Sequence, residues 1–357
     1  MTTSTTGTGA PITTPSVLLS APGAVAADGP DAAVAWHYGD PVREQRLLEA
    51  GEAVVDLSNR GVITVAGPDR LSWLNSLTTQ ALLDAPAGAA REALILSPHG
   101  HVEHDLHLVD DGKVVWLTVE PGTTDVVREW LEKMRFLLRV EVADVSTAWA
   151  VLGAGGELAA RLHAAAGSDA PPVWLDPWPS LGPTSPSYAA VDEAAHPGRG
   201  RSFAEVLVPR DRVAEIVSGV PLAGTWAAEA QRVAAWRPRL GFETDHRTIP
   251  HEVDWLRTAV HLSKGCYRGQ ETVARVHNLG RPPRRLVLLH LDGSEHELPA
   301  HGDAVVHGER QVGFVTTAAR HHELGPIALA LVKRSTPADA QLWAGSVAAA
   351  QELVVAP

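Results

Sequence analysis

The sequence has little of several residue types that particular functions require. Among its 357 residues there is one cysteine, Cys266, so the chain forms no internal disulfide and cannot alone supply a full thiolate set for an iron–sulfur cluster. A single cysteine also fits a reducing compartment. The sequence contains no uninterrupted apolar run of the length that a membrane span needs. We therefore expect a cytoplasmic protein without a membrane partner.

Basic residues are also in short supply. Aspartate and glutamate number 42 against 30 lysines and arginines, which gives a formal net charge of −12. Proteins that bind nucleic acid broadly need a basic face, so direct nucleic-acid binding is not expected. The densest basic stretch contains Arg275, Arg281, Arg284 and Arg285. Such a stretch is either a solvated loop or a surface for the anionic tail of a ligand.

The surroundings of the one cysteine point to a special role. Cys266 lies in the segment Ser263–Glu271 with two glycines nearby, and glycine permits left-handed and closely approached backbone. Lys264 and Arg268 place positive charge two residues to either side, which favours a thiolate over a thiol. Residues 272–276 are rich in β-branched side chains and predict a strand. The pattern is typical of a reactive or ligand-binding thiol, or of a buried structural cysteine at a loop-to-strand turn.

The predicted elements indicate an α+β protein that begins with a mobile segment. Residues 1–30 are rich in Thr, Ala, Gly and Pro and are expected to be mobile, unless the apolar strip at 16–20 docks on the body. Residues 31–150 alternate antiparallel strands with single helices, which predicts a first α+β domain. Its strands are expected at 54–57, 61–67, 92–97, 106–109, 114–119, 140–145 and 149–152, and its helices at 69–77 and 124–134.

A second α+β domain is expected over 151–283 and a small β-barrel over 284–357. The Ala-, Pro- and Gly-rich residues 153–200 predict a surface loop or linker. A strand at 203–209 and helices at 212–217, 227–236 and 255–262 complete the second domain. After residue 284 the pattern is all strand, at 285–291, 304–306, 311–316 and 327–332.

The segment Lys264–Glu271 resembles the signature K-G-C-Y-x-G-Q-E of the YgfZ family, which are folate-binding relatives of the glycine cleavage T-protein, an aminomethyltransferase. The segments 55–67 and 74–79 are similar to the D-L-S…V-x-G-P-D…L-N-x-L-T-T pattern of the same superfamily. The resemblance covers roughly residues 36–335. It implies a three-domain, cloverleaf T-protein-like architecture around a central pocket for tetrahydrofolate or a one-carbon derivative.

The resemblance also implies which residues act. Cys266 is expected to be the working thiol, assisted by Lys264 and Arg268. Asp105 remains from an aspartate pair in the T-protein's G-G-x-x-D-D-L segment, whereas His104 replaces the other aspartate, which argues against aminomethyl transfer. Asp105 is expected either to contact the ligand or to face solvent on its strand. The implied folate-binding residues are Glu252, Tyr267, Gly269, Gln270, Arg275 and Asp105.

Glu252 belongs to a P-x-E element that, with the R-x-G element at Arg239, is expected to shape the folate pocket. A carboxylate can accept two hydrogen bonds from the donor edge of a pterin. Stabilisation by a helix dipole is the alternative reason for an acid at this position. Histidines 101, 104 and 107 alternate along one predicted strand, but no second motif completes a metal site, so no metal is expected.

The leading hypothesis is a folate-binding accessory protein for iron–sulfur cluster assembly or repair, linked to tRNA modification. Its expected partners are folate and iron–sulfur proteins or their assembly machinery. One alternative is a tetrahydrofolate-dependent aminomethyltransferase of the glycine cleavage type. The other is a ligand-binding module without catalysis, in which Cys266 only shapes the pocket.

Overall fold

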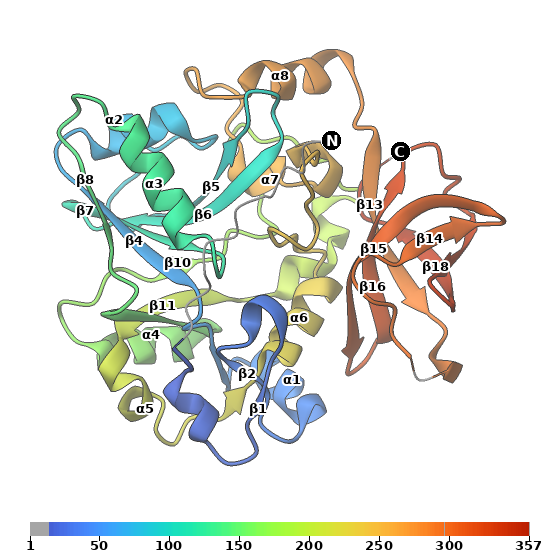
Figure 1. Ribbon diagram of the computed structural model, residues 1–357, viewed down its shortest axis with the longest axis horizontal. Coiled ribbons are helices and arrows are strands. Elements are labelled where there is room, and N and C mark those ends of the chain that lie inside the picture. Colours follow the sequence, from blue (N-terminus) through green and yellow to red (C-terminus); the bar gives the residue numbers. More distant parts are fainter. Residues whose placement is uncertain (1–13, 296, 357) are drawn as a thin grey trace, which may run out of the picture.

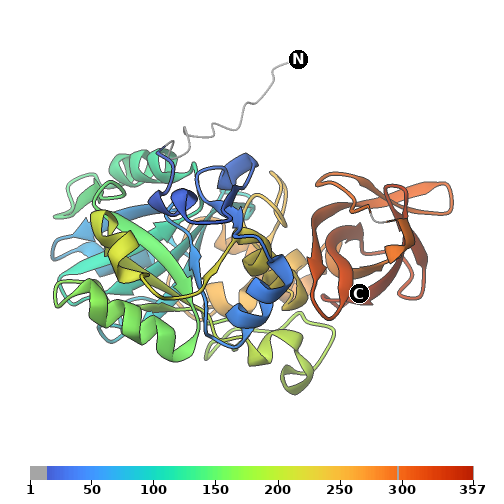
Figure 2. The same cartoon turned by 90° about the horizontal axis from the view of Figure 1, so that it is seen from below.

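The computed structural model describes residues 14–295 and 297–356. They form a body built around two five-stranded sheets, with a closed β-barrel beside it (Figure 1). Seen from below, the barrel lies to one side of the body and covers neither sheet (Figure 2). The predicted α+β fold with a C-terminal barrel is therefore confirmed. Within the described ranges, each helix is too short or too polar to cross a membrane.

The first sheet has two helices on its outer face. Its strand order is β5 (Ala90–Leu96), β6 (Val102–Asp110), β7 (Val114–Val119), β4 (Gly61–Ala66) and β8 (Glu141–Asp144). Helices α2 (Arg70–Leu77) and α3 (Thr124–Met134) bury Leu74 and Leu131 against this sheet. Side chains alternate between the faces of a strand. On β6, Leu106 therefore packs beneath the helices, while Asp105 and His107 lie on the opposite face.

The second sheet joins segments that are distant in sequence. Its order is β10 (Trp174–Leu175), β11 (Ala204–Pro209), β9 (Trp149–Ala154), β3 (Val54–Asp56) and β12 (Leu222–Ala223). Strand β3 pairs antiparallel with β9 and parallel with β12. The first half of the chain thus contributes a strand to this sheet, and a boundary at residue 150 does not coincide with the division between the sheets. Helices α4 (Gly156–Ala166) and α5 (Val213–Ile216) share an apolar core with the outer face of this sheet.

The inner faces of the two sheets meet in a layer that is partly apolar and partly charged. Val62, Val151 and Leu207 form an apolar contact between the sheets. Elsewhere in the layer, β11 contributes Glu205 and β6 contributes His107, whose side chains touch at 3.0 Å. The two sheets therefore enclose charged groups at the middle of the body.

The barrel closes through six strands. Their order is β13 (Arg284–Leu291), β16 (Gly325–Lys333), β15 (Arg310–His321), β14 (Ala304–His307), β17 (Gln341–Ala344) and β18 (Val347–Leu353). The last two strands were not among those predicted, although they complete the closure. The remaining elements are α1 (Pro41–Glu49), α6 (Thr225–Ala234), α7 (Leu256–Ala259), α8 (Gln270–Leu279), β1 (Val25–Ala26), β2 (Ala35–His37) and the 3₁₀ turns at 17–20, 29–31, 193–195, 197–200, 210–212, 250–253 and 293–295.

Two predicted elements are wrong. Residues 272–276, predicted as a strand, belong to helix α8, which follows Gly269 in the left-handed region at φ +83°. The helix buries Val273 and leaves Arg275 in solvent, so tertiary packing outweighs the β-branched preference. The loop predicted from residue 153 contains helix α4, whose many alanines favour a helix and whose Leu158 and Leu162 face the core.

The N-terminal segment is ordered where it is described. Residues 1–13 of the predicted mobile segment lie outside the described residues. Residues 17–20 form a 3₁₀ turn that buries Leu18 in the core of the second sheet, and Ser16 donates a hydrogen bond to Asp56. The docked strip is therefore the correct alternative for this part of the chain.

Glu243 joins the body to the barrel. Its fully buried carboxylate accepts hydrogen bonds from Arg232 of α6 at 2.7 Å and from Thr316 and Thr317 of β15 at 2.9 and 2.6 Å. Removing one partner of a buried ion pair leaves an uncompensated charge. Loss of the Glu243 carboxylate should therefore destabilise the contact between the body and the barrel.

We predict that Glu243→Gln lowers the free energy of unfolding by roughly 1.5–3 kcal/mol, because Arg232 keeps its ion pair with Glu229 but loses a buried charge-assisted hydrogen bond. Urea unfolding monitored by circular dichroism measures this. Glu132→Gln, which removes the exposed pair with Arg128, is the control and should cost at most about 1 kcal/mol. Equal small effects for both variants would contradict the assigned role of Glu243.

Candidate functional site

Buried charged side chains fill the middle of the body. Arg60 donates to Glu120 at 2.6 Å and to Glu205 at 2.8 Å. Arg239 donates to both oxygens of Asp31 at 2.8 and 2.9 Å and to Glu120 at 2.9 Å. These contacts connect the N-terminal segment, the end of β7, β11 and the segment after α6. Each arginine is thus held between two carboxylates.

A second group of ion pairs lies on the other side of this layer. Arg237 contacts Glu92 at 2.7 Å and Asp176 at 3.3 Å, and Arg201 also pairs with Asp176. Burial by itself would raise the pKa of Asp176, but the two arginines outweigh it and hold this pKa below its usual value. Burial raises the pKa of Glu92 in spite of Arg237. The two carboxyls beside Arg237 therefore differ in acidity.

His107 links the two sheets as a cation. Its Nδ1 lies 3.0 Å from Glu205 and its Nε2 lies 3.3 Å from Asp105, and its ring stacks on Trp174 with centroids 3.7 Å apart. Burial would lower the pKa of His107, but the charges of Glu205 and Asp105 outweigh it and raise the pKa to about 10. The imidazole is therefore protonated at neutral pH.

Three neighbouring cavities share lining residues, and one of them lies within this charged layer. The outer cavity has about 280 Å³ and lies where residues 27–36, α6 and β15 meet. It shares Asp31, Thr225 and Glu229 with a middle chamber of about 60 Å³. The middle chamber shares Arg60 and Arg239, among others, with a central chamber of about 50 Å³. The two arginines therefore stand between the outside and the centre.

The central chamber is lined almost entirely by polar and charged side chains. Asp105 Oδ1, Arg201 Nε and Arg237 Nη1 are buried and have no hydrogen-bond partner among the described residues. The chamber thus offers one acceptor and two donors, in a volume that accommodates a few water molecules. Its lining residues are Arg60, Asp105, His107, Glu120, Trp174, Asp176, Arg201, Phe203, Glu205, Arg232, Arg237, Pro238 and Arg239.

Of the predicted site residues, Asp105 lies in the central chamber. Its side chain is buried, so the alternative of a solvent-facing strand position is wrong. His104 is absent from the lining of that chamber, as expected for its neighbour on a strand, and burial lowers the pKa of His104 to about 4. In the T-protein pattern an aspartate stands where this chain has His104. That position therefore lies outside the chamber.

Cys266 is exposed in the loop before α8, so the alternative of a buried structural cysteine is wrong. It is not among the lining residues of the three neighbouring cavities. The neighbouring cations are directed elsewhere. Lys264 Nζ donates to the backbone carbonyls of Asn75, Thr78 and Gln80 at the end of α2, and burial lowers the pKa of Lys264 to about 8.

Arg268 also makes its main contacts away from the thiol. It pairs with Glu103 of β6 at 3.0 Å and lies 5.9 Å from the ring centroid of Trp130. The contacts of Lys264 and Arg268 therefore hold the Cys266 loop against the first sheet and its helices. The geometry gives no support to an assisting role of either cation at Cys266.

Glu252 does not present its carboxylate to a ligand. It is fully buried, its two oxygens accept from Arg284 at 2.9 and 2.8 Å, and one also accepts from the backbone N–H of Ile249. The predicted pterin contact of Glu252 needs a correction, because Arg284 occupies the edge that the pterin would use. Tyr267 packs in the core beside α8, and burial raises its pKa well above the usual value.

The other predicted folate-binding residues have structural positions. A side chain at Gly269 would meet the carbonyl oxygen of Ser97 at 2.6 Å, so the glycine allows the loop to approach the β5–β6 turn. Gln270 begins α8, and Arg275 is exposed on it. The predicted basic surface does not assemble, since Arg284 pairs with Asp245 and Glu252 and the buried Arg285 donates to backbone carbonyls.

The donor atoms of Glu92, Asp105 and His107 lie within 4.8 Å of one another, a spacing that can hold a metal ion. However, Arg237 already neutralises Glu92, and His107 carries the charge between Asp105 and Glu205. A metal ion would have to displace two cations from buried partners. This set is therefore better described as part of the ion-pair layer.

Sequence reasoning missed most of the central chamber. Glu205 and His107 are single charged residues inside apolar strand segments, Ala204–Val208 and Leu106–Val109, and an isolated charge there signals a buried polar partner. The isolated charges are visible in the sequence. Their partner cannot be identified from it, because Arg60 lies in a turn that no local pattern connects with β11. The structure alone brings them together.

Comparison with known proteins agrees with this architecture. Residues 18–170 match the family model described as the GCVT N-terminal domain, and residues 284–354 match the glycine cleavage T-protein C-terminal barrel domain. The fold is similar to the crystal structure of aminomethyltransferase T of the glycine cleavage system from Bartonella henselae, with a TM-score of 0.72, 18% identity and 95% of each chain covered. The chain therefore has the fold of the glycine cleavage T-protein.

Proteins named aminomethyltransferase and one putative transferase are relatives of this chain at low identity. The aminomethyltransferase of Moorella thermoacetica is 26% identical over 310 residues, covering 84% of this chain and 83% of that protein. The aminomethyltransferase of Streptomyces coelicolor is 26% identical over 309 residues, covering 83% and 82%. A putative chloroplastic transferase of Arabidopsis thaliana is 24% identical and covers 76% and 62%. The segment Lys264–Glu271 lies outside both matched family ranges.

The raised pKa of His107 predicts a loss of stability in mild base. The proton of His107 stabilises the fold fully below the ordinary histidine pKa of about 6.5, and this contribution is lost as pH rises towards 10. Between pH 7.5 and 9.5 the wild type should lose about 1.4 kcal/mol per pH unit more than His107→Gln, as measured by urea unfolding. Parallel pH profiles for the two proteins would show that His107 is neutral in the fold.

The exposure of Cys266 predicts ready labelling of the folded protein. Iodoacetamide should modify the native thiol at a rate within about tenfold of that in the urea-unfolded chain, because no packing has to open. Mass spectrometry measures the rate directly, since the chain has one cysteine. Cys266→Ser should take up no label. Labelling that is slow in the folded protein and becomes fast only in the urea-unfolded chain would contradict the exposed position of Cys266.

Proposed function

We propose that this protein binds tetrahydrofolate or a one-carbon derivative in the outer cavity, with access towards Asp105. The T-protein fold and the relatives named aminomethyltransferase support a ligand of this class. The single observation that carries the proposal is the series of three neighbouring cavities that share lining residues, the first lined by aromatic side chains and the last by charged ones.

The outer cavity suits the body of such a ligand. Its volume of about 280 Å³ is close to the lower end of typical ligand pockets, and Trp36, Trp226 and Phe242 line it. Arg320 also lines it and carries a charge opposite to that of a folate carboxylate. The central chamber, at about 50 Å³, is too small for a pteridine. A ring could reach Asp105 only if Arg60 and Arg239 moved.

We further propose that the folate-bound protein assists iron–sulfur cluster assembly or repair, with Cys266 as the working thiol. The support is the match of Lys264–Glu271 to the YgfZ signature and the exposure of the thiol. An exposed thiol outside the cavities is suited to contact with a partner protein, such as an iron–sulfur protein or its assembly machinery. A Cys266→Ser chain that keeps full activity in cells would favour a binding module without catalysis.

The aminomethyltransferase alternative is favoured by a specific observation. Asp105 lies in the central chamber beside the cationic His107, whereas the substituted position His104 lies outside it. The loss of that second aspartate is therefore a weaker argument against aminomethyl transfer than the sequence alone indicates. Formation of methylene-tetrahydrofolate in the presence of glycine-cleavage partner proteins would favour this alternative over the accessory role.

Folate binding can be tested with two exposed tryptophans. Titration with tetrahydrofolate should change the tryptophan fluorescence of the wild type, and Trp36→Ala should weaken binding roughly tenfold, because stacking on an aromatic ring contributes about 1–3 kcal/mol. Trp343→Ala is the matched control, since this tryptophan is exposed on the barrel outside the cavities. Equal affinities in both variants would place the ligand elsewhere, and no saturable response would exclude folate.

A further inference from the structure

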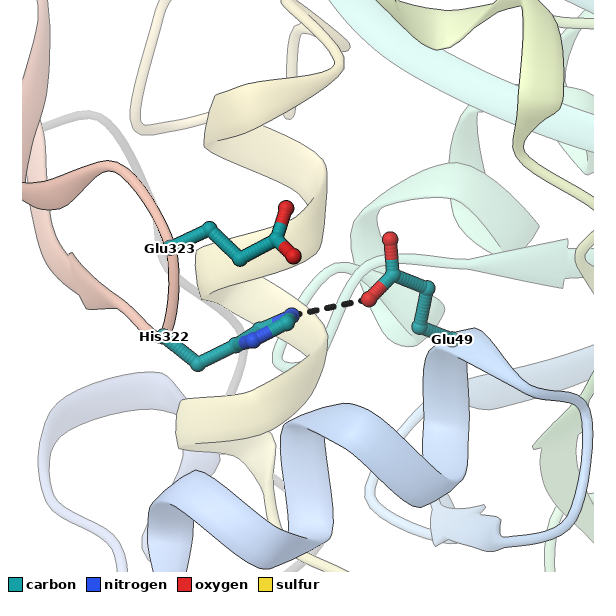
Figure 3. Close-up of side chains that lie close together, drawn as sticks. All are labelled: Glu49, His322 and Glu323. Atoms are coloured by element: carbon teal, nitrogen blue, oxygen red, sulfur yellow. Dashed lines mark hydrogen bonds and ion pairs between the residues drawn. The ribbon is translucent and has the colours of Figure 1, made fainter.

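Three potential metal ligands converge outside the cavities, where the barrel meets helix α1. Glu49 ends α1, and His322 and Glu323 lie in the turn between β15 and β16. One donor atom from each side chain lies within 4.8 Å of the other two. Figure 3 shows the two carboxylates and the imidazole directed towards a common point, with His322 Nε2 at 2.8 Å from Glu49.

The histidine of this group is held in place before any ligand binds. The side chain of His322 is 4% exposed, while that of Glu49 is 56% exposed, so the imidazole forms the floor of an open site. The backbone N–H of His322 donates to Gln45 Oε1 at 2.9 Å, and Gln45 Nε2 donates to the carbonyl of Arg320 at 2.9 Å. Helix α1 thus fixes the turn that carries two of the three ligands.

The neighbouring His321 supports the turn and is not itself a ligand. Its ring stacks on His322 with centroids 4.7 Å apart. Its Nδ1 accepts from the backbone N–H groups of Glu323 and Leu324 at 3.2 Å, so that nitrogen is unprotonated and occupied. His321 therefore stabilises the turn, whereas His322 offers its Nε2 atom as a metal ligand.

We propose that Glu49, His322 and Glu323 form a binding site for a divalent transition-metal ion such as Zn²⁺. Imidazole nitrogen and carboxylate oxygen are both ligands that proteins use for such ions, and the exposed side of the site leaves the remaining positions open to water. On binding, the metal takes the place of the hydrogen between His322 Nε2 and Glu49, and that proton is released to solvent. The site uses one ligand from the body and two from the barrel.

Such an ion would fasten the barrel to the body beside the outer cavity. The residues that precede His321 on β15, from Thr317 to Arg320, line that cavity. A metal ion bound to the following turn and to α1 would restrict the movement of this wall of the cavity. The inference does not depend on the nature of the cavity ligand, because the metal ligands all lie outside the cavity lining.

The test uses the full-length chain with Cys266→Ser, because Cys266 is the one thiol of the chain and a thiolate would compete for Zn²⁺. Isothermal titration with zinc chloride should show one equivalent bound in this background. Glu323→Gln and His322→Asn should each weaken the affinity at least tenfold. Cobalt chloride should give visible absorption in the background protein and lose it in both variants. Zinc should raise the Tm of the background protein alone.

The barrel offers a matched control. His290 and Glu352 form the same type of pair at 3.0 Å on β13 and β18, so His290→Asn removes a histidine–glutamate contact and should leave zinc affinity unchanged. Glu323 lies in an exposed turn, so Glu323→Gln tests the site even if His322→Asn weakens the junction. No saturable zinc binding, or equal affinity in Glu323→Gln and His290→Asn, would overturn the proposal.

Discussion

The charged layer between the two sheets is the constraint on which the body depends. Arg60 and Arg239 each lie between two buried carboxylates, and His107 carries a proton between Glu205 and Asp105. Ions taken out of water in this way are stable only with close partners, because the cost of removing their hydration is several kcal/mol for each ion. The segments that supply the partners are therefore fixed relative to one another, although they come from all parts of the body sequence.

The same layer controls what can reach the centre. Arg60 and Arg239 line both inner chambers, so a ligand larger than a few waters must move an arginine away from its carboxylates. Moving it is costly unless the ligand offers replacement acceptors. A polar ligand group would be favoured over an apolar one, because it could bond to the unpaired donors of Arg201 and Arg237 and to the unpaired acceptor of Asp105. The central chamber is thus suited to polar groups, whereas the aromatic lining of the outer cavity is suited to ring contacts.

Local patterns in the sequence predict the elements better than they predict the site. The barrel strands and the alternation from β4 to β8 follow from period-two patterns and turn residues. The strand expected at 272–276 is wrong, because this segment follows the left-handed Gly269 as part of helix α8, which buries only Val273 and pairs with no strand among the described residues. The partners of Arg60 and Arg239 are up to 208 residues away in sequence, and such pairings are set by sheet packing, which local chemistry does not encode.

Strand β6 connects the exposed thiol loop with the charged centre. Asp105 and His107 share the inner face of β6, whereas Glu103 is the extra residue of a β-bulge opposite Leu96, beyond which Val102 takes up the inner face. Glu103 pairs with Arg268, two residues after Cys266, whereas Asp105 and His107 belong to the central layer. The loop of Cys266 and the charged centre are therefore attached to one strand on the two sides of a bulge, although Cys266 itself lines no part of the central chamber.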